Sequence, residues 1–211
     1  MIKWKLAQFF ELLWWRKYFL FKTKDSYYTW KKNYWQSLVS SLKTINITDK
    51  NTIADLGCGP AGIFILFDKN EVIAVDPLLE KYKKNLSFFD PSTYPNVNFF
   101  DATIEDFVCK EKFDFVFCMN AINHVANIQK AFQKICDLSS DKLIVSIDAH
   151  NHNFLKTIFR LIPGDILHPH QYNLEEYKTF LSERNFKIIE TNCIKKDFIF
   201  NHYILVAQKN E

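Results

Sequence analysis

Short apolar runs recur from residue 51 onward, and each has the length of a buried β-strand. Five of them precede residue 150, at about 52–56, 72–76, 97–100, 113–118 and 143–148. Helical patterns separate these runs at about 61–67, 79–86 and 127–137. Because buried strands that alternate with helices are typical of a parallel sheet covered on both faces, the pattern predicts an α/β fold.

The first 43 residues have a different character. Two helical patterns, at about 3–21 and 26–42, contain all five tryptophans of the chain and no glycine or proline. This segment holds nine Lys or Arg against two acidic residues, a net charge of +7, whereas the whole chain carries +3. We therefore predict a helical aromatic and basic cap at 1–45, followed by a single domain at 46–211.

The stretch after the fifth strand, about 149–172, contains an apolar helical face and four histidines. We expect it to form a lid over an apolar pocket, the alternative being a helix that packs on the sheet. A helix at about 174–183 begins with Asn173 and Glu176, which have the spacing of a capping box. Strands at about 186–192 and 198–207 complete the chain.

Glycine is scarce, and its placement is informative. Of four glycines, Gly57, Gly59 and Gly62 lie within six residues, between a predicted strand and a predicted helix. Such a turn lets the backbone approach a ligand at a helix amino terminus. Asp76 ends the next strand, seventeen residues after Gly59, where a carboxylate can accept hydrogen bonds from ribose hydroxyls.

Several motifs occur together and in a family's order. They are Asp55-Leu-Gly-Cys-Gly59, Val75-Asp76, Phe100-Asp101-Ala102, Phe113-Asp-Phe-Val116 and Asn120-Ala-Ile-Asn-His-Val125. On these residues the chain from about 51 to 192 resembles the class I S-adenosylmethionine-dependent methyltransferases. The resemblance is strongest to the small-molecule branch typified by quinone-biosynthesis enzymes.

The resemblance implies a Rossmann-like seven-stranded, mostly parallel sheet whose last strand is antiparallel, with S-adenosylmethionine as cofactor. Gly57 and Gly59 would lie under the methionine moiety, and Asp76 would bind the ribose. Asp101 and Ala102 would address the adenine. Asn120 would line the cleft beside the methyl group, and Asp55 would help to hold the cationic end of the cofactor.

One departure from the family keeps a second enzyme class open. The family usually has a glycine where this chain has Ala61, and Gly62 follows instead, which recreates the G-x-G-x-x-G pattern of nicotinamide-dependent oxidoreductases. Asp55 opposes that alternative, since a pyrophosphate needs neutral or positive surroundings. A non-catalytic binding partner with the same fold is a third possibility, which the intact glycine motif disfavours.

Five of the six histidines follow the fourth or fifth strand, so we expect them to converge above the cofactor. A histidine could accept the proton of a hydroxyl or amine acceptor. The candidates, in order, are His168, His170, His150 and His124. Two His-x-His pairs, 150/152 and 168/170, could instead chelate a metal, but no regular metal motif is present and we predict none.

The expected acceptor is a small, partly apolar molecule. Residues 1–43 lack RNA-binding signatures, and they fit either a cap over the acceptor cleft or a peripheral anchor on an anionic membrane. No run of about 20 apolar residues and no signal-peptide pattern occurs, so we expect a cytoplasmic, possibly membrane-peripheral protein. The five cysteines include no C-x-x-C pair and are expected to be reduced.

Overall fold

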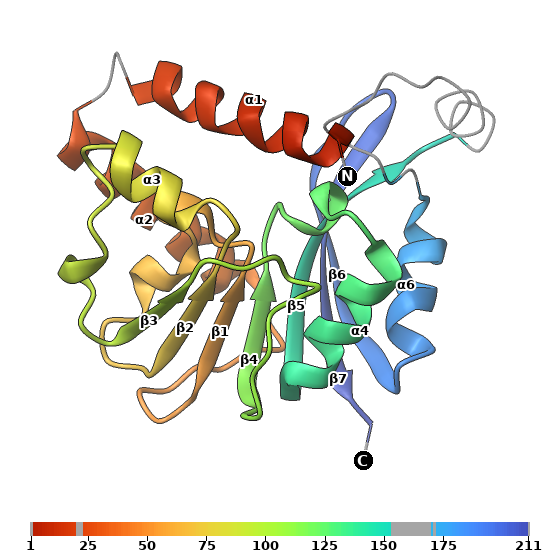
Figure 1. Cartoon of the computed structure of the whole chain (residues 1–211). Coiled ribbons are helices and arrows are strands. Elements are labelled where there is room, and N and C mark those ends of the chain that lie inside the picture. The colour runs from red at the N-terminus through yellow and green to blue at the C-terminus, as the bar shows by residue number, and fades with distance from the viewer. Residues whose placement is uncertain (1, 20–22, 153–169, 171, 211) are drawn as a thin grey trace.

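The computed structural model describes residues 2–19, 23–152, 170 and 172–210, and it contains one seven-stranded sheet (Figure 1). The strands are β1 (Ile53–Leu56), β2 (Val72–Val75), β3 (Val97–Phe100), β4 (Phe113–Cys118), β5 (Ser139–His150), β6 (Phe186–Lys196) and β7 (Phe200–Lys209). Their order is β3-β2-β1-β4-β5-β7-β6. Only β7 runs antiparallel to its neighbours, which confirms the predicted α/β sheet.

Helices cover both faces of this sheet (Figure 1). They are α1 (Ile2–Phe19), α2 (Lys24–Ser41), α3 (Leu79–Asn85), α4 (Ile128–Leu138) and α6 (Leu174–Ser182). One apolar core joins α4 and α6 to the sheet, and a second joins α2 and α3 to the opposite face. Helix α1 crosses the upper edge of the sheet in Figure 1, near the carboxyl ends of the parallel strands. None of the described helices is both long and apolar enough to cross a membrane.

The helix predicted at about 61–67 does not form. Two short 3₁₀ helices replace it, η1 (Gly59–Ala61) and η2 (Ile63–Leu66), with Gly62 extended between them (φ −71°, ψ −172°). The cause is Asp55, whose Oδ2 accepts a hydrogen bond from the Phe64 N–H at 3.0 Å. A Cβ on residue 62 would collide with that same oxygen, so only glycine lets the backbone approach the carboxylate.

Strands β5 and β6 are longer than the apolar pattern predicts, and β7 is shifted by two residues from the predicted 198–207. Pairing of β5 with β7 continues to His150 and Phe200, and pairing of β6 with β7 continues to Lys196. Backbone hydrogen bonds hold these polar extensions, which have no alternating apolar signal. Helix α6 begins with the capping box predicted from Asn173 and Glu176. The greater part of the lid predicted at 149–172 lies outside the described residues.

Helix α2 is part of the core as well as a cap. Trp35 is 3% exposed, and its Nε1 donates a hydrogen bond to the carbonyl oxygen of Ala61 at 3.0 Å. The hydroxyl of Tyr28 lies 3.3 Å from the carbonyl oxygens of Pro60 and Phe88. Through these contacts the amino-terminal helices are attached to the glycine loop.

We predict that Trp35→Ala lowers the free energy of unfolding by about 3–5 kcal/mol, because it removes a buried ring and leaves a cavity. Trp35→Phe should cost less, since it removes the hydrogen bond but keeps most of the apolar contact. Trp30→Ala on the same helix is the control, because Trp30 is 51% exposed. Chemical denaturation measures all three, and equal losses for Trp35→Ala and Trp30→Ala would contradict the packing described.

Candidate active site

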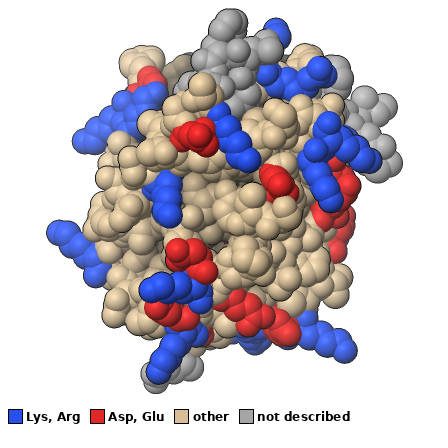
Figure 2. All heavy atoms as spheres, turned by 90° about the vertical axis from the view of Figure 1, so that its left-hand side faces the viewer, with Lys and Arg blue, Asp and Glu red and all other residues tan. Residues whose placement is uncertain are grey.

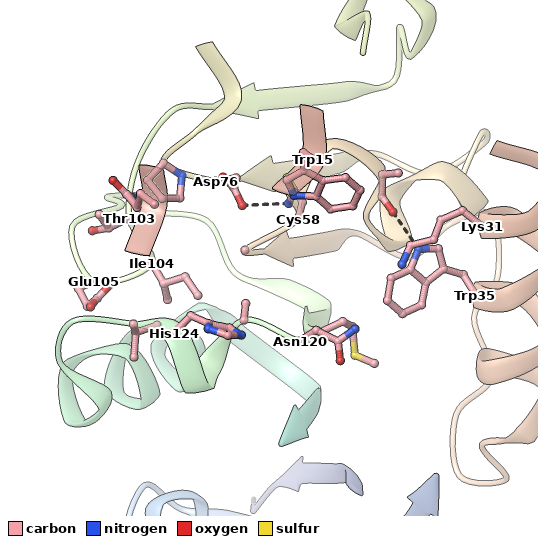
Figure 3. Close-up of a pocket in the computed structure, with 18 residues that line it drawn as sticks. Trp15, Lys31, Trp35, Cys58, Asp76, Thr103, Ile104, Glu105, Asn120 and His124 are labelled. Carbon is pink, nitrogen blue, oxygen red and sulfur yellow. Dashed lines mark hydrogen bonds between the residues drawn. The ribbon is translucent and has the colours of Figure 1, made fainter. Parts of the chain in front are cut away.

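A cavity of about 180 Å³ opens at the carboxyl ends of β1, β2 and β4 (Figure 3). Its lining comes from the loops that follow the first four strands and from both amino-terminal helices. Helix α1 contributes Gln8 and Trp15, while α2 contributes Lys31 and Trp35. Trp14, adjacent to Trp15, is 54% exposed, as the roughly 100° angle between successive helical residues predicts.

The glycine loop forms the floor of the cavity. Gly57 has a φ of +75°, and a Cβ there would overlap the Cβ of Ala121, so both conformation and space require glycine. The N–H of Gly59 donates to Oδ2 of Asp76 at 2.9 Å, and the N–H of Leu78 donates to Oδ1 at 2.9 Å. Asp76 therefore joins the glycine loop to the turn before α3.

Asp55 is the second-last residue of β1, directly before this loop, and is 1% exposed. Its Oδ1 is buried and has no hydrogen-bond partner among the described residues, while Oδ2 accepts from Phe64. Burial raises the pKa of Asp55 to about 7, although hydrogen bonds from the backbone N–H groups and the positive charge of Lys31 oppose the rise. The orphan oxygen is a buried acceptor without a partner among the described residues, and such a group requires an explanation.

Lys31 is the cationic counterpart of Asp55. Its Nζ lies 4.3 Å from the centre of the Trp35 ring and 5.0 Å from that of Tyr34, a cation–π arrangement (Figure 3). Burial lowers the pKa of Lys31 to about 8, and the charge of Asp55 opposes this shift. The sequence analysis treated Lys31 only as one of nine basic residues; its spacing of one helical turn from Trp35 was the available signal.

The segment after β4 forms the opposite wall. Asn120 has a φ of +56°, which asparagine tolerates better than most residues. Its N–H donates to Ser146 Oγ at 2.6 Å, and the Ser146 hydroxyl donates back to its Oδ1 at 3.1 Å. Glu105 Oε1 accepts hydrogen bonds from the N–H groups of Ala126 and Asn127, which anchors the end of this segment.

Most of the cofactor residues expected from the sequence meet at this cavity. Gly57, Gly59, Asp76 and Asn120 line it, and Asp55 lies behind it. Asp101 and Ala102 are not among the lining residues, since Asp101 Oδ2 accepts from the N–H of Glu80 at 2.8 Å. The wall on this side is instead formed by the next three residues, 103–105.

The histidines do not converge as expected. Among the described histidines, only His124 lines this cavity. His150 is buried with its ring centre 4.3 Å from that of Phe200, and His170 lines a second cavity. His168 lies outside the described residues. The described residues contain no cluster of His, Cys, Asp and Glu with the arrangement of a metal site.

Comparison with known proteins identifies the family to which the chain belongs. A family model described as "Methyltransferase domain" matches residues 47–198. A putative methyltransferase 235L of Invertebrate iridescent virus 6 is 26% identical over 198 residues, which cover 83% of this chain and 69% of that protein.

Solved structures share the fold at lower identity. Magnesium protoporphyrin IX methyltransferase from Synechocystis PCC 6803 with bound SAH superposes with a TM-score of 0.56 at 19% identity, covering 87% of this chain and 83% of that one. Phosphoethanolamine N-methyltransferase 2 of Haemonchus contortus superposes with a TM-score of 0.64 at 15% identity, covering 85% and 53%.

The family match runs from before β1 into the turn between β6 and β7, and so includes every loop that builds the cavity. The chain therefore belongs to the family of methyltransferase domains, and its fold is that of the class I S-adenosylmethionine-dependent methyltransferases.

Proposed function

We propose that this methyltransferase transfers a methyl group from S-adenosylmethionine to a hydroxyl or amine of a small, partly apolar acceptor. When bound, S-adenosylmethionine supplies a methyl group made electrophilic by a positively charged sulfonium. The observation that carries the proposal is the excess of acidic over basic side chains around the glycine loop. Asp76 and Glu105 line the cavity and Asp55 lies behind it, whereas Lys31 is the one Lys or Arg among the described lining residues. An excess of negative charge at the cavity favours the binding of a positively charged group.

The residues present fit the cofactor. The orphan Oδ1 of Asp55 offers an acceptor for the amino group of the methionine moiety, either directly or through a water molecule. A Cβ placed on Gly59 would meet no atom within 4 Å, so the loop leaves open space for a ligand there. The carboxylate oxygens of Asp76 accept backbone hydrogen bonds from Gly59 and Leu78. A carboxylate has about four acceptor positions, so Asp76 can also accept from ribose hydroxyls.

Lys31 would hold the carboxylate of the methionine moiety. The amino and carboxylate groups of that moiety carry opposite charges, as do Asp55 and Lys31, which interact electrostatically in the structure. This assignment makes α2 a part of the cofactor site, in addition to the role of a cap over the acceptor.

The alternatives are less well supported. A dinucleotide would place its pyrophosphate near Asp55, against the charge of this carboxylate. The two solved neighbours are named for different acceptors, a porphyrin and a phosphoethanolamine, so the shared fold does not select the acceptor of this chain. The aromatic side chains of Trp15 and Trp35 in the wall favour an acceptor with an apolar part.

S-adenosylhomocysteine, which keeps the amino and carboxylate groups, should bind more weakly as the pH falls from about 7 to about 5, a range in which Lys31, with a pKa of about 8, stays charged. Because the pKa of Asp55 in the unliganded protein is about 7, acid protonates the carboxylate, which binding requires in its ionised form. The loss should approach tenfold per pH unit below the pKa, since one proton must be released on binding. Calorimetry measures this affinity as a function of pH. Asp55→Asn should bind S-adenosylhomocysteine weakly, with an affinity that does not change with pH over this range. A falling profile that persists in Asp55→Asn would contradict the role of Asp55.

Replacing Lys31 by methionine should weaken S-adenosylhomocysteine binding by roughly 10- to 150-fold, the value of one charge-assisted hydrogen bond of about 1.5–3 kcal/mol. Lys32→Met is the matched control, because Lys32 is exposed and does not line this cavity. Calorimetry on both variants tests the assignment. Equal affinities for the two variants would show that Lys31 does not contact the cofactor.

A peripheral membrane contact of the amino-terminal helices is a second role that the surface favours. Phe10, Trp14 and Trp30 are about half exposed, and Lys and Arg side chains gather in the upper part of the face shown in Figure 2. We predict weak, salt-sensitive sedimentation with phosphatidylglycerol vesicles and none with phosphatidylcholine. Strong binding that survives high salt would instead make the membrane anchor the main role of these helices.

A further inference from the structure

A second cavity, of about 210 Å³, lies over β5 and β7. Its lining includes Asn123 after β4, Asp148 on β5, His170, and Phe200 and His202 on β7. His202 belongs to no motif in the sequence, because it is a lone histidine in a terminal strand. The structure places it at the same edge of the sheet as the cofactor cavity, since β7 is antiparallel and begins where β5 ends.

His202 and Asp148 form a hydrogen-bonded pair inside this cavity. Asp148 and His202 are register partners on β5 and β7, and His202 Nδ1 lies 2.8 Å from Asp148 Oδ1. An ionised carboxylate only accepts hydrogen bonds, so Nδ1 carries the proton and Nε2 is left as the basic nitrogen. The structure gives Nε2 no hydrogen-bond partner among the described residues. The pair is therefore arranged to accept a proton from a ligand.

His170 lines the same cavity but is not equivalent. Its Nε2 lies 2.7 Å from the carbonyl oxygen of Val125, which can only accept, so this nitrogen must be the donor. Burial lowers the pKa of His170, although the hydrogen bond to Val125 opposes that shift. His170 thus holds the wall of the cavity, and His202 carries the nitrogen that can take up a proton.

One segment of the chain borders both cavities. His124 and Val125 line the first cavity, and Asn123, the residue before them, lines the second. The side chain of Asn123 exchanges two hydrogen bonds of 3.1 Å with the backbone of Asp148 and donates a third to the hydroxyl of Tyr177 at 2.8 Å. A ligand in the second cavity therefore lies next to the segment, 120–125, that also borders the cofactor site.

We propose that this second cavity binds the methyl acceptor, that the acceptor is a neutral hydroxyl compound such as a phenol, and that His202, oriented by Asp148, accepts the hydroxyl proton. The inference rests on the proposed methyl transfer. A carboxylate acceptor is already ionised and would face both Asp148 and Asp197, while Lys195, the cation of this lining, is already paired with Asp197 at 3.4 Å. Phe200 offers an apolar surface to a ring. The acceptor oxygen forms its new bond to the methyl carbon, the carbon–sulfur electron pair stays on sulfur, and the hydroxyl proton moves to His202 Nε2.

The probe is 4-nitrophenol, whose anion is yellow and whose neutral form is not, added to the full chain with S-adenosylhomocysteine present. Bound 4-nitrophenol should be more ionised than the free compound at the same pH, because His202 takes its proton. His202→Gln and Asp148→Asn should each lower the ionisation equilibrium of bound 4-nitrophenol by about tenfold or more, which is a pKa change of about one unit or more.

The matched controls are Asp141→Ala and Gln208→Ala. They break a 3.1 Å hydrogen bond between the same two strands, β5 and β7, at the opposite end from the cavity. Both controls should keep the anion signal, and all four variants should keep the affinity for S-adenosylhomocysteine. A loss of signal in the controls as well would show that the pair only stabilises the strands.

Turnover provides the second measurement. S-adenosylhomocysteine production from S-adenosylmethionine should be detectable with 4-nitrophenol and not with benzoate, and should fall in His202→Gln. If the wild type binds S-adenosylhomocysteine but leaves 4-nitrophenol unbound, or methylates benzoate instead, the acceptor inference fails and the proposed function stands. If the wild type does not bind S-adenosylhomocysteine at all, the proposed function itself fails.

Discussion

The buried carboxylate of Asp55 is the constraint on which the glycine loop and the cavity depend. It lies near the end of the interior strand β1, accepts the N–H of Phe64, and excludes any side chain at position 62. The chain must therefore turn as two short 3₁₀ helices, and the loop is held open toward the cavity. A buried charge without full compensation is costly. The unsatisfied oxygen of Asp55 would be stabilised by a cationic ligand group, and the amino group of the cofactor's methionine moiety is such a group.

The amino-terminal helices complete that arrangement. Trp35 joins α2 to the loop through Ala61, and Lys31, one turn earlier, brings the opposing positive charge over the aromatic rings. One helix thereby contributes to the apolar core, to the wall of the cavity and to its charge balance. Stability and ligand binding are linked in this region, because both rest on the same face of α2.

The sequence predicted the features whose signals are local. Buried strands have continuous apolar runs, and Asp55, Gly57, Gly59 and Asp76 belong to short motifs at strand ends, so sheet and loop were both predictable. The prediction of a helix at 61–67 was wrong, because the apolar spacing of these residues does not reveal the hydrogen bond from Phe64 to Asp55. Lys31 and His202 were missed because their partners lie far away along the chain. The histidines after β5 were expected at one site, but their positions at strand ends do not determine where the rings point.

The most direct test is a crystal structure of the full chain with S-adenosylhomocysteine bound. The account predicts that the amino group of the ligand reaches Asp55 Oδ1 directly or through one water molecule, that its carboxylate contacts Lys31, and that its ribose hydroxyls lie on Asp76. A ligand bound away from the glycine loop, or one whose amino and carboxylate groups contact neither Asp55 nor Lys31, would contradict it.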